Sequence, residues 1–225
     1  MLQLLRKYFP QWFPVEKVHS GYNTLEVVRR DKNLILNAPH VNYSFGTLHQ
    51  VFRNAFRQLN PDYRKIENVL ILGFGAGSVA TILQKENHCD CHITGVEIDE
   101  KVIALAEKYF RLDELKNLEL HIEDAADFLS KVAKQYDLLV VDLFLDHRTP
   151  EKFLTAAFLK NLYAHIQPRG IVIFNYLLYD YEAKEKAIVF EKEFRKIFRQ
   201  VRVLSFKKHP KNIVFIIELP EFNDL

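Results

Sequence analysis

Three of the seven glycines in this 225-residue chain lie within five positions, at Gly73, Gly75 and Gly77. Glycine averages about 7% of protein residues. A glycine-poor chain that concentrates it in one place needs backbone there that other residues do not readily adopt. Residues 68–72 before the glycines form a short apolar run, and residues 78–83 after them carry apolar side chains at helical spacing. The glycines are therefore predicted to form a turn between a strand and a helix.

The same alternation of strand and helix continues along the rest of the chain. Apolar periodicity predicts helices over residues 102–109, 125–132, 154–162 and 183–197, and strands over residues 92–98, 118–122, 138–141, 170–178, 201–206 and 212–219. Strands that alternate with helices indicate a parallel sheet with helices on both faces. No helix is expected between the last two strands, which should form an antiparallel hairpin. The predicted fold is α/β, a doubly wound Rossmann-like sheet of seven strands.

Residues before about position 61 follow a different pattern. Apolar runs on both sides of the polar turn 30–33 predict a β-hairpin. A helix with Phe52 and Phe56 on one face is predicted to follow it. We therefore expect two units, an N-terminal helix and β-hairpin lid over residues 1–60 and a ligand-binding α/β domain over residues 61–225.

Acidic residues follow three successive predicted strands. Glu97 lies at the end of the second strand, Asp124 follows the third and Asp142 follows the fourth. In open α/β sheets the ligand lies outside the carboxyl ends of the strands, so these side chains should meet at one edge. A carboxylate can accept hydrogen bonds from both hydroxyls of a ribose, and Glu97 follows Gly77 by 20 residues, the distance expected of a ribose partner. Asp124 could accept from the exocyclic amine of adenine, and Asp142 lies where a reaction would occur.

Each of these acids also has a structural interpretation. An isolated Glu97 could be a solvated loop residue, although its distance from the glycine turn favours the ribose role. Asp124 could equally cap the third helix, because aspartate is a preferred N-cap, and both interpretations stay open. For Asp142 the position at the end of an apolar strand favours a functional role.

The glycine segment differs from the known phosphate-binding loops. Its third glycine falls one position short of the dinucleotide pattern, and no Gly-Lys-Ser/Thr follows. A pyrophosphate would also require cations, whereas these strand ends are acidic. A sulfonium nucleoside such as S-adenosylmethionine carries a cation and no phosphate. We therefore predict that such a ligand contacts Gly73, Phe74, Gly75, Ala76, Gly77, Glu97, Ile98, Asp124 and Ala125.

Three segments carry a resemblance, VLILGFGAG at 69–77, VEID at 96–99 and YDLLVVD at 136–142. Together they resemble the spermidine synthase family, an offshoot of the class I S-adenosylmethionine-dependent methyltransferases. The resemblance spans most of the chain and implies a methyltransferase-like nucleoside-binding domain over residues 61–225. It also implies that the glycine loop holds the tail of S-adenosylmethionine or of its decarboxylated form. Glu97 would then hold the ribose, Asp124 the adenine, and Asp142 would be the catalytic aspartate.

The chain departs from the aminopropyltransferases of that family at three places. In the glycine loop this chain has Ala76, where the aminopropyltransferases share an acidic residue. It has Leu48-His49-Gln50 where they have Tyr-His-Glu. Asp146 is out of register with the second acid of their Asp-x-x-Asp-Pro segment and has no proline beside it. A diamine is a dication near neutral pH and needs carboxylates when it is buried. The loss of these carboxylates favours methyl transfer over aminopropyl transfer.

Three functions follow as hypotheses. The first is methyl transfer from S-adenosylmethionine to a small-molecule acceptor, with Asp142 orienting or deprotonating the acceptor and His49 assisting from the lid. The second is aminopropyl transfer to make a polyamine, with Asp142 as the base and Asp146 serving in spite of its shift. The third is a catalytically silent binding or assembly module, in which the aromatic segment 8–13 docks on a partner or on a second copy in a homodimer.

Composition narrows the classes of partner. With 31 basic and 29 acidic residues the formal charge is +2, so a nucleic-acid-binding protein is not expected, and a solvated turn explains the basic run 207–211. Cys89 and Cys91 are too few for a disulfide scaffold. No metal site is predicted, because on an extended strand these cysteines face away from His88 and His92. No apolar stretch approaches the roughly 18 residues of a membrane span, and no signal peptide is recognised, so a cytoplasmic protein without membrane contact is expected.

Overall fold

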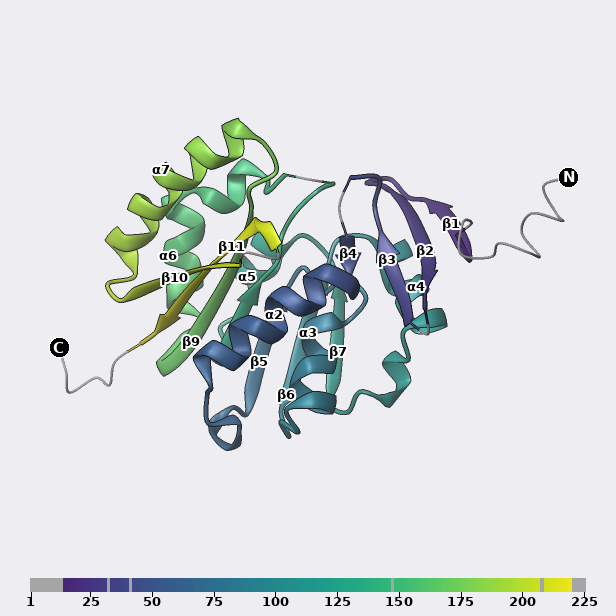
Figure 1. Ribbon diagram of the computed structural model, residues 1–225. Coiled ribbons are helices and arrows are strands. Elements are labelled where there is room, and N and C mark those ends of the chain that lie inside the picture. The colour runs from purple at the N-terminus through teal and green to yellow at the C-terminus, as the bar shows by residue number, and fades with distance from the viewer. Residues whose placement is uncertain (1–13, 32, 41, 147, 207–208, 220–225) are drawn as a thin grey trace, which may run out of the picture.

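The computed structural model describes residues 14–31, 33–40, 42–146, 148–206 and 209–219 (Figure 1). The aromatic segment 8–13, and with it the predicted homodimer contact, lies outside the described residues, as does part of the basic run 207–211. Among the helices that are described, none is long and apolar enough to cross a membrane.

Seven strands form the central sheet in the spatial order β10-β11-β9-β8-β5-β6-β7. Neighbours from β9 to β7 in this order pair in parallel, and β11 runs antiparallel to both β9 and β10. This confirms the predicted doubly wound α/β sheet with an antiparallel final hairpin. The strands are β5 (Asn68–Leu72), β6 (His92–Glu97), β7 (Leu118–Ile122), β8 (Tyr136–Val141), β9 (Ile166–Leu177), β10 (Val201–Phe206) and β11 (His209–Glu218).

Successive residues of β5 are buried in two separate cores. Val69 and Ile71 pack in the core that includes side chains of α2, α3 and α4, and Leu70 and Leu72 pack in the core that includes side chains of α5, α6 and α7. Such a continuous apolar strand is expected when both faces of a parallel sheet are covered. In Figure 1, α2 crosses in front of the sheet. The helices are α2 (Gly46–Leu59), α3 (Ser78–Thr81), α4 (Glu100–Tyr109), α5 (Ala125–Lys131), α6 (Ala156–Ala164) and α7 (Tyr181–Ile197).

Short helical turns modify two of the predicted helices. The helix predicted over 154–162 is divided into a 3₁₀ turn, η5 (Glu151–Leu154), and α6. Thr155 separates them because its hydroxyl accepts a hydrogen bond from the Phe158 N–H and caps α6. The helix after the glycines begins as α3 and continues as a π-helical turn, η3 (Ile82–Glu86). Two further 3₁₀ turns are η2 (Tyr63–Lys65) and η4 (Leu112–Glu114).

The N-terminal part forms a four-stranded antiparallel sheet in the order β1-β2-β3-β4 (Figure 1). The predicted hairpin is present as β2 (Thr24–Arg30) and β3 (Asn33–Asn37), and β1 (Glu16–His19) and β4 (Asn42–Ser44) extend it. These outer strands were not predicted, because four or three residues carry too little periodicity. The domain boundary at residue 60 stays a prediction. Helix α2, on the N-terminal side of that boundary, packs against α3 and β11.

Candidate functional site

The glycine turn lies between β5 and α3, as predicted. Gly73 has a φ of +82° and Gly75 a φ of +58°, backbone conformations that a side chain disfavours. At Gly73 there is also no room for a side chain, since a Cβ would lie 2.2 Å from the carbonyl oxygen of Asp142. The absence of a side chain at Gly73 therefore lets the chain after β5 approach the chain after β8. These neighbouring strands flank the point where the strand order reverses, which is where ligands bind in this class of fold.

Glu97, the last residue of β6, is held against the glycine turn. Its Oε2 accepts a hydrogen bond of 2.9 Å from the Gly75 N–H, and its Oε1 accepts one of 3.2 Å from the Asp99 N–H. Burial raises the pKa of this carboxyl to about 7 in spite of these hydrogen bonds. At neutral pH a carboxyl with this pKa is partly protonated. A ligand that donates hydrogen bonds to it would favour its ionised form.

Asp142 follows β8 and is also buried. The Asn175 Nδ2 donates a hydrogen bond of 2.7 Å to its Oδ1, and the Asn212 Nδ2 in turn donates one of 3.0 Å to the Asn175 Oδ1. This chain of amides fixes which atom of Asn175 faces Asp142. Burial, with the nearby charge of Glu97, raises the pKa of Asp142 to about 7.

Asp124 does cap a helix, one of the two roles predicted for it. Its Oδ1 accepts from the Ala126 N–H at 2.9 Å and from the Asp127 N–H at the start of α5. Its Oδ2 forms an ion pair with the Lys152 ammonium group from η5. Burial alone would raise the pKa of Asp124, but Lys152 and the helix N–H groups hold it below its usual range.

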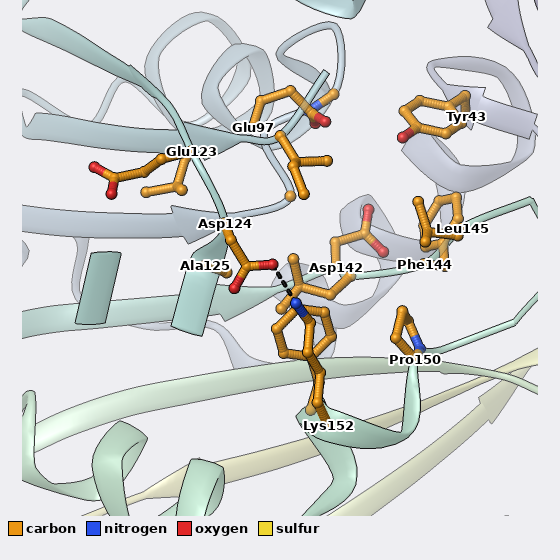
Figure 2. Close-up of a pocket in the computed structure, with 16 residues that line it drawn as sticks. Tyr43, Glu97, Glu123, Asp124, Ala125, Asp142, Phe144, Leu145, Pro150 and Lys152 are labelled. Atoms are coloured by element: carbon orange, nitrogen blue, oxygen red, sulfur yellow. Dashed lines mark hydrogen bonds and ion pairs between the residues drawn. The ribbon is translucent and has the colours of Figure 1, made fainter. Parts of the chain in front are cut away.

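The strand ends and the loops after them enclose a cleft of about 630 Å³, counting the space at its open mouth (Figure 2). Of the predicted site residues, it is lined by Gly73, Gly75, Glu97, Ile98, Asp124, Ala125 and Asp142. Phe74, Ala76 and Gly77 are not part of this lining. Phe74 is buried, and a Cβ on Gly95 would lie 2.4 Å from its ring. The structure thus brings the three predicted carboxylates together and directs the Phe74 side chain elsewhere.

The lining also includes residues outside the sequence-based prediction, among them Tyr43 and Lys152. Tyr43 of β4 enters the cleft from the N-terminal sheet, with its ring 5.4 Å from that of Phe144 (Figure 2). Burial and the charges of neighbouring carboxylates raise the pKa of Tyr43, so its hydroxyl stays a hydrogen-bond donor. Lys152 enters from η5 on the opposite side. No local pattern indicated either residue, because a short unpredicted strand presents Tyr43 and a short 3₁₀ turn presents Lys152.

His49 and Asp146, the other predicted catalytic residues, are not part of the cleft lining. His49 lines a separate, open cavity of about 1810 Å³, again counting the space at its mouth, and its Nε2 lies 2.7 Å from the Glu86 Oε1. Burial lowers the pKa of His49. Asp146 lies 2.7 Å from the His40 Nδ1 through its Oδ2 and accepts from the His40 N–H through its Oδ1. This placement gives no support to direct contact of either residue with a ligand in the cleft.

The two cysteines are buried ahead of β6 rather than on an extended strand. The Cys89 Sγ lies 3.6 Å from the backbone carbonyl oxygens of Tyr63 and Ile66, which it can reach as a weak donor. Across the described parts of the chain, no group of three or more His, Cys, Asp or Glu side chains is arranged to hold a metal ion.

The sequence family can be assigned with this geometry in place. Residues 58–216 match the family described as the spermine/spermidine synthase domain, and this match covers more than half of the chain. The chain belongs to the spermine/spermidine synthase family. The predicted resemblance is therefore confirmed.

The relatives that match this chain have two kinds of transferase activity in their names. The polyamine aminopropyltransferase of Vibrio vulnificus (strain CMCP6) is 32% identical over a match covering 56% of this chain and 44% of the relative. The eEF1A lysine and N-terminal methyltransferase of Bos taurus is 25% identical over 53% of this chain and 19% of the relative. The match thus spans less than half the length of these curated relatives.

Solved structures show the same fold. The probable spermidine synthase from Corynebacterium glutamicum ATCC 13032 has a TM-score of 0.73 at 17% identity and covers 90% of this chain and 79% of its own. Human methyltransferase-like protein 13, solved in complex with SAH, has a TM-score of 0.64 at 20% identity, with 76% and 82% covered. Both kinds of protein therefore share the architecture of this chain.

Proposed function

We propose that this protein is a transferase that binds S-adenosylmethionine, or its decarboxylated form, in the cleft of Figure 2 and transfers a methyl group to a small acceptor. The observation that carries this proposal is the joint placement of Glu97, Asp124 and Asp142 around the glycine turn in one cleft. The transferase names of the relatives and the SAH complex of a protein with this fold agree with it.

The residues of the cleft fit such a nucleoside. Both oxygens of Glu97 already accept a backbone N–H, and each has a further lone pair for a ribose hydroxyl. Gly73 and Gly75 present backbone without side chains to the tail of the ligand. Asp124 stands beside Ala125 at the start of α5, where a carboxylate can accept from the adenine amine.

The reaction would be a direct displacement. The bound sulfonium supplies an electrophilic carbon, the acceptor's electron pair forms the new bond to it, and the carbon–sulfur pair stays on sulfur as a neutral thioether. Asp142 would orient the acceptor and take its proton, for which a pKa of about 7 is suitable at neutral pH. The remaining contribution is alignment of the two reacting atoms.

Methyl transfer is favoured over aminopropyl transfer by the charges of the cleft. Asp146, which would have to help hold a diamine, is paired with His40 outside the cleft lining. Ala76 and Gln50 are uncharged, and they stand at positions where the aminopropyltransferases that this chain resembles have acidic residues. With fewer carboxylates, the desolvation of a dication would not be compensated.

Calorimetry with S-adenosylmethionine and with its decarboxylated form tests the ligand. We expect the former to bind in the micromolar range, and if neither binds below millimolar concentration the enzyme proposal is wrong. Product analysis with decarboxylated S-adenosylmethionine and putrescine tests the alternative, which the 32% identity to a polyamine aminopropyltransferase keeps in view. Formation of spermidine would establish aminopropyl transfer instead.

A silent binding module is the remaining alternative. It predicts that Glu97→Ala leaves the cellular phenotype unchanged while removal of residues 1–14 abolishes it. We also propose a cytoplasmic location and a homodimer. Size-exclusion chromatography of the full chain and of the chain without residues 1–14 tests the dimer.

A further inference from the structure

Lys152 forms an ion pair across the cleft at the end where the adenine would lie. It is part of η5, and its ammonium group reaches Asp124 at the start of α5, 28 residues earlier in the chain. Figure 2 shows this ion pair between the two walls. Of the cleft-lining residues, all in the described part of the chain, Lys152 alone is cationic.

This ion pair completes the coordination of Asp124. The Oδ1 accepts hydrogen bonds from the first N–H groups of α5, and the Oδ2 accepts from Lys152. The Asp124 side chain is only 14% exposed, so there is little solvent around it from which a third approach could be made. A ligand group that donates a hydrogen bond to Asp124 must therefore displace the Lys152 ammonium group.

The exocyclic amine of adenine is also a donor. Two donors cannot both bind the Asp124 Oδ2 from the same direction. The ammonium is charged and makes a stronger hydrogen bond than the neutral amine. Displacement of Lys152 is nevertheless feasible. Its side chain is 55% exposed, so it can turn into solvent.

We propose that Lys152 competes with the exocyclic amine of the base for Asp124 and so sets both the affinity and the base preference of the cleft. This inference rests on the proposed function, because it takes adenine to be the base. While Lys152 is paired, the base edge offers a donor, which matches a 6-oxo purine. Once Lys152 has moved, the edge offers an acceptor, which matches adenine.

The test is calorimetry on the full chain with two probes, S-adenosylhomocysteine and S-inosylhomocysteine, which carries an oxygen in place of the 6-amine. Lys152→Met keeps the length and apolar stem of the side chain and removes the charge. A partly exposed ion pair contributes up to about 1 kcal/mol, so we expect Lys152→Met to bind S-adenosylhomocysteine about two- to fivefold more tightly. The same variant should bind S-inosylhomocysteine less tightly than the wild type does.

Two variants serve as controls. Lys152→Arg keeps a cation on Asp124 and should not gain affinity for S-adenosylhomocysteine. Lys108→Met removes a comparable pair elsewhere, since Lys108 contacts Glu16, is 58% exposed and lies 5.1 Å from the next residue's ring. It should leave the affinities for both probes unchanged.

The outcomes separate this inference from the proposed function. If the wild type binds S-adenosylhomocysteine and Lys152→Met binds it equally or more weakly, Lys152 is not a competitor, and the proposed function stands. An equal gain for both probes would also overturn the inference, because Lys152 would then only occupy space. If neither the wild type nor Lys152→Met binds S-adenosylhomocysteine, both proposals fail.

Discussion

Gly73→Ala introduces a methyl group at the point where the chain after β5 approaches Asp142. The new Cβ would lie 2.2 Å from the carbonyl oxygen and 2.8 Å from the carbonyl carbon of Asp142. Both are backbone atoms next to a strand that is hydrogen-bonded to β5, with the Asp142 N–H donating to the Leu72 carbonyl at 2.8 Å. No side-chain rotation can relieve this contact, so the two chain segments must separate.

The expected loss of stability has two parts. A residue other than glycine in the left-handed region costs about 1–2 kcal/mol, and Gly73 has a φ of +82°. Forcing an extra methyl group into a packed site costs about 1–3 kcal/mol. We therefore expect Gly73→Ala to lower the free energy of unfolding by about 2–5 kcal/mol, a large share of the 5–15 kcal/mol typical of a domain.

Urea unfolding followed by circular dichroism measures this loss, and Gly21→Ala is the matched control. A Cβ on Gly21 would have no atom within 4 Å, so its free energy of unfolding should stay within about 0.5 kcal/mol of the wild type. If Gly73→Ala is as stable as Gly21→Ala, the close approach of the two segments is refuted. Because Asp142 must move, Gly73→Ala should also weaken binding of S-adenosylhomocysteine.

Further predictions concern the carboxyls. Glu97→Gln should weaken S-adenosylhomocysteine binding about 10- to 100-fold in calorimetry, since hydrogen bonds to a charged group contribute about 1.5–3 kcal/mol; unchanged affinity would exclude the ribose role. Asp142→Asn can still accept from Asn175 and should fold normally, but turnover should fall by about 10²- to 10⁴-fold if Asp142 is the base. The pKa values of Glu97 and Asp142 are about 7 in the folded chain, above their ordinary 4.5 and 3.8. The folded state therefore binds more protons, and the stability this contributes is present below about pH 4 and lost as the pH rises through 7. The melting temperature of the ligand-free protein should fall from pH 5 to pH 8, and less so in the Glu97→Gln, Asp142→Asn double variant. Affinity for the cationic S-adenosylmethionine should increase over the same range, relative to the neutral S-adenosylhomocysteine.

The glycine turn and two of its acidic partners could be predicted because their positions follow from the order of strands, turns and helices along the chain. A strand, a turn and a helix follow each other within residues 68–83, and parallel pairing places the ends of successive strands at one edge. Glu97 and Asp142 are therefore found where the alternation of strands and helices predicted. The sequence did not distinguish the two roles predicted for Asp124, because a helix cap and a ligand contact require the same position.

The roles predicted for His49 and Asp146 depended on how distant segments pack against each other, which the sequence does not specify. His49 lies on α2, and its partner Glu86 is 37 residues later in a π-helical turn. Asp146 is bound by His40, which is 106 residues earlier in the chain. Tyr43 reaches the cleft from a strand of three residues, too short for a periodic signal.

The sequence by itself determined the seven-stranded α/β fold, the glycine turn and the edge of the sheet at which a ligand would bind. These features follow from the period of apolar residues and from spacings of a few residues, which the covalent chain fixes. Only the tertiary structure decided which acids are available there. Lys152 is paired with Asp124 and His40 with Asp146, whereas the hydrogen bonds that Glu97 and Asp142 accept within the described part of the chain come from uncharged backbone or amide N–H groups. Such pairings join residues far apart in the chain, so they depend on how the loops pack and not on any local pattern.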